Sequence, residues 1–278
     1  MVAVPQPGAA ATVAPFTLVI ELDAWNIRER DGWGQTAAWR AKDKNFSRWH
    51  WVYTGTCFQL SQRVIQGKQR AVILERSYVA TRQGIPELMQ RLHYEAQRRG
   101  LAYAERVLVI ADGAVWIWNA VTDRFAQAVQ RLDLFHANTY LWAVAGALHG
   151  EGTSAARKWV KPLLQQVRQD RVAQVIQHLT ELTPTLTTAG QPQTTQAIAY
   201  FTNNQDRMRY PAGKQRGEPL GSGAIESTCR QLQCRLKRPG QFWSTAGDEA
   251  LLTLECCWRN DQWEQLFPHA RLTSVARN

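Results

Sequence analysis

The first half of the chain carries strand-like and helix-like segments in an order that few folds use. Three segments rich in β-branched and aromatic residues come first, and each is typical of a β-strand: 16–23, 50–60 and 70–82. Residues 85–100 then switch to helical spacing, with Gly100 as the stop signal. An apolar strand follows at 106–112, then a short helical link and a last strand that ends near Asp133.

This order predicts how the strands pair. The opening run of three strands indicates antiparallel pairing, whereas strands separated by helices indicate parallel pairing. The fold class is therefore α/β, with a mixed five-stranded sheet and flanking helices. This is the order of elements found in the ribonuclease H fold.

The second half of the chain is helical. The spacing predicts helices from about Asn138 to Arg209, interrupted by a proline- and threonine-rich loop at 183–195. A glycine-rich turn then leads into a basic helix, and a terminal helix begins with Ser244 or Thr245 as its N-cap. We expect four parts: a flexible leader at 1–15, the first part of a core at 16–137, a helical insertion at 138–209, and the rest of the core at 210–278.

The net charge of +10 favours a polyanionic partner such as DNA, although a basic solvated surface gives the same number. The five cysteines form no CxxC pair, so we expect reduced and mostly buried thiols rather than disulfides or a zinc site. The sequence shows neither a signal peptide nor an apolar run long enough to span a membrane. These features predict a cytoplasmic protein with no membrane partner.

Three acids occupy comparable places: Asp23 at the end of the first strand, Asp112 at the end of the fourth, and Glu226 at the start of the basic helix. If the first and fourth strands are neighbours, Asp23 and Asp112 meet, and a helix packed across the sheet brings Glu226 to them. Carboxylates suit Mg²⁺ or Mn²⁺, and two such ions activate a water or a 3′-hydroxyl for attack on a phosphodiester. Taken singly, each acid is more typical of a turn or a helix cap than of a metal site.

A D-x-x-H pair, Asp133 and His136, ends the last strand. One interpretation places it beside the metal cluster, where it orients the substrate. The other has His136 capping the following helix or satisfying a buried partner.

Basic residues cluster around Glu226, and they suit either a solvated face or contacts to DNA phosphates: Arg207, Arg209, Arg230, Arg235, Lys237 and Arg238. Most of the tryptophans should lie in the core. Trp116 and Trp118, which follow Asp112, are expected to pack the next helix rather than to touch DNA. Among the tryptophans, one or two are candidates to stack on an unpaired base.

Several of these segments resemble the catalytic region of bacterial insertion-sequence transposases of the ISKra type, which belong to the DDE class and are related to Mutator-like transposases. The matching motifs occur in the family's order: IELDAWNIRERDGWG, ADGAVWIWN, RLDLFHA, YFTNNQDRMRY and GSGAIESTCRQLQCRLKRPGQFWS. The resemblance runs from about Phe16 to Phe267, which is nearly the whole chain.

The resemblance implies a ribonuclease H-like core with an all-helical insertion before the catalytic glutamate. It also implies that Asp23, Asp112 and Glu226 hold two Mg²⁺ or Mn²⁺ ions, and that Asp133 and His136 form the family's D-x-x-H motif. The implied reaction is hydrolysis at transposon ends, followed by attack of the freed 3′-hydroxyl on target DNA, by a homo-oligomer.

One departure separates the chain from this family, whose members carry a long N-terminal region that binds transposon ends. This sequence starts one short leader before the first strand. That predicts either a truncated copy or an end-binding domain on another chain. Two alternatives therefore stay open: a catalytically silent remnant that binds DNA and regulates a full-length enzyme, and a nuclease of the same fold without strand transfer.

Overall fold

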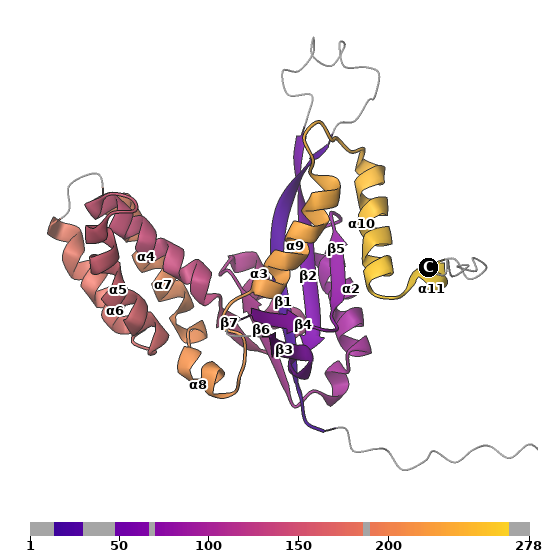
Figure 1. Cartoon of the computed structure of the whole chain (residues 1–278), viewed down its shortest axis with the longest axis horizontal. Coiled ribbons are helices and arrows are strands. Elements are labelled where there is room, and N and C mark those ends of the chain that lie inside the picture. The colour runs from indigo at the N-terminus through magenta and orange to yellow at the C-terminus, as the bar shows by residue number, and fades with distance from the viewer. Residues whose placement is uncertain (1–13, 30–47, 67–69, 186–189, 267–278) are drawn as a thin grey trace, which may run out of the picture.

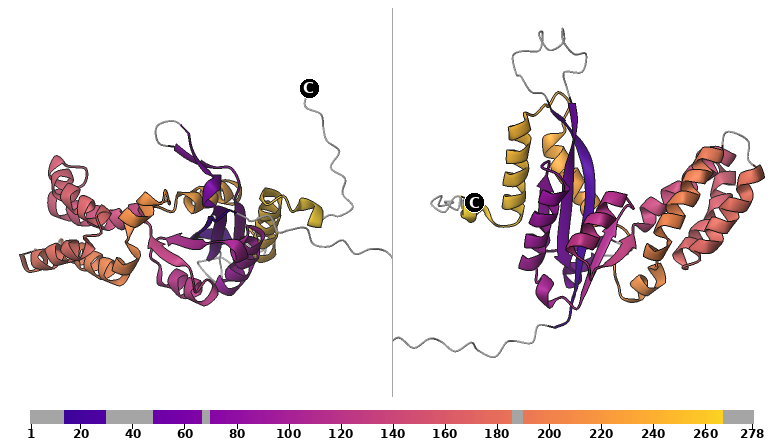
Figure 2. Two further views of the ribbon diagram at one scale, coloured as in Figure 1. Left: turned by 90° about the horizontal axis from the view of Figure 1, so that it is seen from below. Right: turned by 180° about the vertical axis from the view of Figure 1, so that it is seen from behind.

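The computed structural model describes residues 14–29, 48–66, 70–185 and 190–266 (Figure 1). The expected leader at 1–15 lies almost wholly outside these residues, as do Trp33, Trp39 and part of the loop at 183–195. The described part is an α/β structure in which a sheet with its covering helices forms one lobe. A second lobe of helices projects from it (Figures 1 and 2).

The main sheet has five strands in the order β5-β2-β1-β6-β7. Their bounds are β1 Thr17–Glu29, β2 Arg48–Gln59, β5 Ser77–Thr81, β6 Arg106–Ala111 and β7 Val129–Leu132. β1, β2 and β5 pair antiparallel, whereas β1, β6 and β7 pair parallel. The prediction of a mixed sheet with the first and fourth strands as neighbours is confirmed, and this order is compatible with the ribonuclease H fold.

Successive side chains of β1 point alternately to the two faces of the sheet. Leu18, Ile20 and Leu22 lie in a core with α2 (Ile85–Arg98) and α3 (Val115–Arg124). Trp25 and Ile27 point to the opposite face, against α9 (Gly223–Leu236) and α10 (Thr245–Arg259). The face that carries the odd-numbered residues of β1 is therefore the face on which α9 lies.

The second lobe, which we call the helical lobe, consists of α4 Leu134–His149, α5 Ser154–Arg168, α6 Val172–Leu182 and α7 Gln191–Asn204. Its apolar residues form one cluster with those beneath α2 and α3, so the core runs on from the sheet into the lobe. Two short helices complete the described chain, α8 Tyr210–Gln215 and α11 Trp263–Leu266. No helix among the described residues is long and apolar enough to cross a membrane.

Three predicted boundaries are wrong. Asp23 does not end the first strand, because β1 continues to Glu29 and pairs with β2 from Leu18 to Glu29. The strand predicted at 70–82 is two strands: β4 (Arg70–Ile73) forms a separate hairpin with β3 (Arg63–Gln66), while β5 joins the main sheet. The first helix of the lobe begins at Leu134 rather than near Asn138, because Asp133 caps it.

The aromatic residues divide between core and surface. Trp118 is buried, and its indole N–H donates to Asn204 Oδ1 at 3.2 Å, while Trp116 packs edge-on against Tyr53. Both therefore pack α3 against its surroundings, as predicted. The expectation that most tryptophans are buried is wrong for Trp49, Trp51 and Trp142, whose side chains are exposed. The five cysteines are all free, and Cys57, Cys229 and Cys256 are buried.

Candidate functional site

Asp23 and Asp112 come together through the parallel pairing of β1 and β6. The paired residues run from Thr17 beside Arg106 to Glu21 beside Ile110. Two steps further along the same register, Asp23 is level with Asp112, the first residue after β6. The sequence prediction that these two acids meet is therefore supported by the strand register, although Asp23 lies within its strand.

Asp23 is half-buried beneath α9. Its Oδ1 atom accepts a hydrogen bond from the Ala24 amide at 2.7 Å, and its Oδ2 atom lies 3.7 Å from Cys229 Sγ. Burial raises the pKa of Asp23, and the negative charges of Asp112 and Glu226 raise it further. Asp112 and Glu226 are thus both close enough to repel Asp23, and we call Asp23, Asp112 and Glu226 the carboxylate site.

Asp112 lies in a turn whose next residue has a backbone conformation that favours glycine. Its Oδ1 atom accepts from the Ala114 amide at 3.0 Å, and Gly113 has a φ of 100°. A Cβ at Gly113 would also press on Leu132 and Tyr200. The turn therefore fixes the Asp112 side chain at the junction of β6 and α3.

The helical lobe contributes an aromatic cluster to this turn. The Tyr200 hydroxyl donates to the Asp112 carbonyl oxygen at 2.6 Å. The Tyr200 ring stacks on Tyr140, with ring centroids 3.8 Å apart, and His136 packs against both rings. Burial raises the pKa of Tyr200, and the nearby charge of Asp112 adds to this, so the hydroxyl stays a donor.

Glu226 is exposed in the first turn of α9, and the start of that helix is tied to the sheet. The Ile225 amide donates to Glu21 Oε2 at 2.8 Å. Arg76, which follows β4, donates from its guanidinium to the Ala224 carbonyl at 3.0 Å. These two contacts fix the backbone from which Glu226 projects.

Asp133 provides a third tie. Its Oδ1 atom caps α4 by accepting from the Phe135 amide at 2.6 Å and the His136 amide at 3.1 Å. Its Oδ2 atom accepts from the Ser222 amide at 2.9 Å and also from the Ser222 hydroxyl. Asp133 is buried, and its two oxygens have separate roles: Oδ1 caps α4, and Oδ2 joins the end of β7 to the turn before Glu226. It is Asp133, and not His136, that caps the helix.

Glu21 is a fully buried carboxylate two residues before Asp23 on the same face of β1. Burial raises its pKa to about 8, and the charge of Asp133 acts in the same direction, while the hydrogen bond from Ile225 opposes the shift. The sequence reading missed Glu21. Its signal was an acid inside the otherwise apolar strand TLVIEL, at even spacing from Asp23.

No lysine, arginine or histidine among the described residues forms an ion pair with Asp23, Asp112 or Glu226. Three neighbouring carboxylates that no basic side chain of the described residues pairs with supply the hard oxygen ligands that a divalent cation prefers. Within the same residues, however, no three metal-ligating side chains are gathered closely enough to hold an ion. The donor chemistry therefore fits Mg²⁺ or Mn²⁺, and ligation requires the three side chains to approach one another.

The predicted DNA-binding residues occupy different environments. On and after α9, Arg230 is exposed without a charged partner in the described chain, Arg235 pairs with Glu255 at 2.7 Å, and Lys237 lies over the Trp49 ring. Arg238 follows α9 and donates back to it, to the Cys234 carbonyl.

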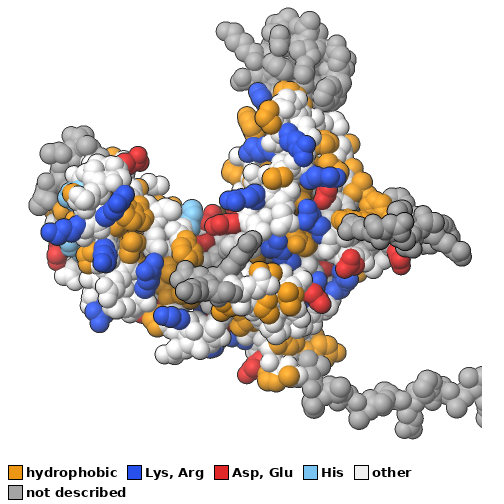
Figure 3. Space-filling view, viewed as in Figure 1, with side chains coloured by type: hydrophobic (Ala, Val, Ile, Leu, Met, Phe, Trp, Pro, Cys, Tyr) orange, Lys and Arg blue, Asp and Glu red, His pale blue; other side chains and the backbone are white. Residues whose placement is uncertain are grey.

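The two upstream arginines lie elsewhere. Arg207 packs over the Trp118 ring and donates to Gln130 at 2.7 Å, so it contacts α3 and β7 rather than α9. Arg209 is exposed and only 4.0 Å from Asp206. In Figure 3, acidic side chains gather at the notch where the two lobes meet, and basic side chains lie on both lobes around it.

No protein-family model matches the sequence, and a search of curated proteins finds no match either.

Proposed function

We propose that the chain is the catalytic region of a metal-dependent phosphoryl-transfer enzyme that acts on DNA, of the DDE transposase type. The observation that carries the proposal is the carboxylate site. Asp23 and Asp112 are brought level by parallel strands, Glu226 faces them from α9, and the described residues offer none of the three a cation. The order of the strands and the helical lobe between Asp112 and Glu226 are those expected of a ribonuclease H-like core with a helical insertion.

In this proposal Asp23, Asp112 and Glu226 hold two Mg²⁺ or Mn²⁺ ions, which supply an activated attacking oxygen and stabilise the leaving oxygen of a phosphodiester. The chain's own residues do the rest. The turn at Gly113 and the Tyr200 hydroxyl hold Asp112 in place. Glu21 and Asp133 hold the first turn of α9, and so set where Glu226 projects.

The reaction implied by the family resemblance has two steps. Water attacks the phosphodiester at a transposon end, a phosphorus–oxygen bond forms, and the bond to the 3′ oxygen breaks, which leaves a free 3′-hydroxyl. That hydroxyl then attacks a target phosphodiester and displaces its 3′ oxygen. The net charge of +10 supports a DNA partner through its attraction for phosphates.

Activity assays on DNA test the proposal. Wild type should nick or join DNA only with Mg²⁺ or Mn²⁺, and Asp112→Asn should lose at least about a thousandfold of that activity. Asp123→Asn is the matched control, because Asp123 is an exposed carboxylate on α3 outside the site. Equal activity of the two variants would overturn the assignment.

Two other results would redirect the proposal. Hydrolysis that never leads to joined products would identify a nuclease without strand transfer. Salt-sensitive DNA binding with no cleavage under either metal would identify a DNA-binding protein whose carboxylate site is silent.

A further inference from the structure

A groove of about 920 Å³ opens beside the carboxylate site, with Glu226 in its lining. The β3–β4 hairpin forms one wall, and the segment between α8 and α9 forms the other. The floor includes Glu21 and Phe58 beneath the first turn of α9. Figure 1 shows the hairpin at the end of α9 where that helix begins. We call this feature the hairpin groove.

Basic side chains line both walls of the groove. Arg63 on the hairpin and Lys214 on α8 have no charged partner in the described chain. Arg76 also lines the groove and is fixed by hydrogen bonds to Tyr78 and Ala224. Two unpaired cations facing one groove are suited to an anionic ligand.

The acids in the lining do not cancel this charge. Glu21 accepts from the Ile225 amide and is fully buried. Glu218 is buried and pairs with Arg131 at 2.6 Å, Arg106 at 2.9 Å and Arg216 at 3.0 Å. Within the lining only Glu226 remains open, and it stands at the carboxylate site. The groove is therefore positive along its walls and negative where it meets that site.

The wall between α8 and α9 is held firmly. Burial alone would raise the pKa of Glu218, but the hydrogen bond and charge of Arg131 hold it below its usual value, so Glu218 stays ionised among its arginines. Asp133 fixes Ser222 at the other end of this wall. A groove with fixed walls binds without a large ordering cost.

Apolar side chains are exposed on both walls. Ile65 on the hairpin is 67% exposed, and Phe135 at the start of α4 is 62% exposed. Phe135 lies over Gly221, where any Cβ would overlap its ring, so the glycine permits this position. An exposed ring and an aliphatic side chain next to unpaired cations are the combination that binds bases and phosphates of an unpaired strand.

We propose that the hairpin groove binds an unpaired segment of the DNA strand whose phosphodiester lies at the carboxylate site, and this rests on the function proposed above. Arg63 and Lys214 contact phosphates, and Phe135 stacks on a base. A volume of about 920 Å³ lies at the upper end of the range for pockets that enclose small ligands, and this size suits a segment of a few nucleotides.

Binding measurements without divalent metal test this, because neither probe is then cleaved. The probes are a blunt DNA duplex and the same duplex with a 3′ overhang of about six nucleotides. Wild type should bind the overhang probe more tightly. The double variant Arg63→Gln/Lys214→Gln should bind that probe about tenfold more weakly. For the overhang probe, the slope of log K plotted against log salt concentration should become less steep by about 1.4. For the blunt probe, both the affinity and this slope should change little.

The matched control is Lys161→Gln/Arg168→Gln, which removes the same two charges from exposed positions on α5. It should leave the preference for the overhang intact. Phe135→Ala should weaken overhang binding without changing the salt slope, and thermal melting of each variant reports that it is folded.

Three results would overturn the proposed role of the groove. Wild type would show no preference for the overhang probe, the double variant would lose equal affinity for both probes, or the control variant would lose as much affinity as the double variant. The proposed reaction is judged separately by metal-dependent cleavage. If cleavage is absent while the groove variants lose overhang binding, the reaction fails and the groove stands. If cleavage is present while they bind normally, the groove fails and the reaction stands.

Discussion

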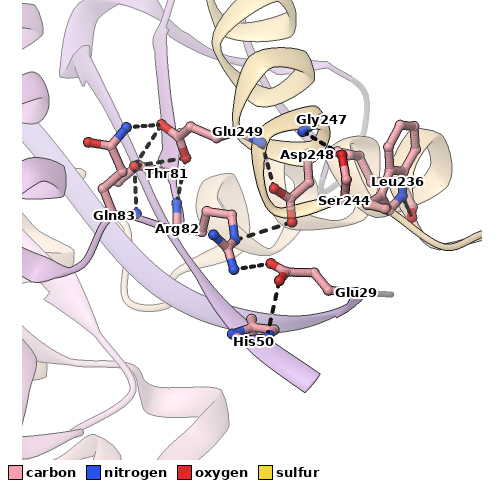
Figure 4. A network of polar contacts seen from close by, with 11 residues as sticks. Glu29, His50, Thr81, Arg82, Gln83, Leu236, Ser244, Gly247, Asp248 and Glu249 are labelled. Carbon is pink, nitrogen blue, oxygen red and sulfur yellow. Dashed lines mark hydrogen bonds and ion pairs between the residues drawn. The ribbon is translucent and has the colours of Figure 1, made fainter. Parts of the chain in front are cut away.

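β1 supplies acids to two clusters, one in which the acids pair with basic side chains and one in which they do not. At its end, Glu29 and Asp248 of α10 are both buried, and the Arg82 guanidinium lies between them (Figure 4). Further back along the strand, Asp23 meets Asp112 and Glu226 with no basic side chain of the described residues paired to any of them. We call the first cluster the Arg82 network.

The difference separates acids that hold the fold together from acids that are free to bind a ligand. In the Arg82 network Arg82 Nε lies 3.2 Å from Asp248 Oδ2, and His50 Nε2 lies 3.1 Å from Glu29 Oε2. The Arg82 amide donates to Glu249 at 2.8 Å, which holds the arginine in place. These acids pair with basic side chains inside the protein, whereas those of the carboxylate site have no such partner in the described chain and remain open to a cation from outside.

Removal of the central cation should have the largest effect on stability. Arg82→Gln leaves Glu29 and Asp248 buried without their arginine, so we expect the free energy of unfolding to fall by about 3–5 kcal/mol. Urea unfolding measures this. Arg235→Gln is the control, because it breaks an exposed pair with Glu255 and should cost at most about 1 kcal/mol. Equal losses would mean that the network contributes no more than a surface pair.

The next effect concerns the tie between β7 and α9. In Asp133→Asn the side-chain oxygen can still cap α4, but the amide NH₂ group cannot accept from Ser222. We expect a loss of about 2 kcal/mol in unfolding free energy, because two donors lose a buried acceptor. If the proposed function holds, activity falls as well, since Glu226 is then less well positioned. Unchanged stability would show that Ser222 finds another acceptor.

A pH dependence distinguishes the two clusters further. Burial raises the pKa of Asp248 from its usual 3.8 to about 7, and the neighbouring Glu29 adds to this, against the opposing charge of Arg82. Between these values the folded state binds a proton that the unfolded state has lost, so stability falls as the pH rises from about 4 to about 7. The amide side chain introduced by Asp248→Asn does not titrate, so this variant lacks that contribution to the pH dependence.

We therefore expect Asp248→Asn to gain about 2 kcal/mol relative to wild type when both are taken from pH 4 to pH 8. Urea unfolding across that range measures the difference between the two curves. Asp123→Asn, at an exposed position, is the control and should follow wild type. Parallel curves for Asp248→Asn and wild type would show that Asp248 is ionised throughout.

Local patterns predicted the sheet because strand and helix spacing are properties of short segments. The length of β1 was missed although Trp25 and Ile27 continue its alternation, since the next inward residue is an acid, Glu29. That residue points inward because Arg82 and Asp248 meet it, and both are distant in the sequence. The separate β3–β4 hairpin was missed for a similar reason. The strand breaks at 74–76 because β4 pairs with β3 while β5 pairs with β2, and local spacing does not specify these partners.

The carboxylate site shows the same limit. Asp112 was predicted because an apolar strand runs directly into it, and Glu226 because a glycine turn precedes it. Glu21 was missed because its partner, the Ile225 amide, lies 204 residues away. Asp133 was singled out, but its partner Ser222 was not, because no local pattern joins a strand end to a turn 89 residues later.

The smallest expected effect is also the one that most directly separates the two clusters. Asp23→Asn removes one of three repelling charges, so without divalent metal we expect its unfolding free energy to equal or exceed that of wild type, by at most about 1 kcal/mol. With Mg²⁺ at about ten times its dissociation constant, wild type should gain about 1.4 kcal/mol, since the ion binds only the folded state. The variant should gain little, because the ion has lost a ligand.

Arg235→Gln keeps the carboxylate site and should respond to Mg²⁺ as wild type does. A destabilised Asp23→Asn that still responds fully to Mg²⁺ would mean that Asp23 is a structural acid like Glu29, and the contrast between the two ends of β1 would disappear.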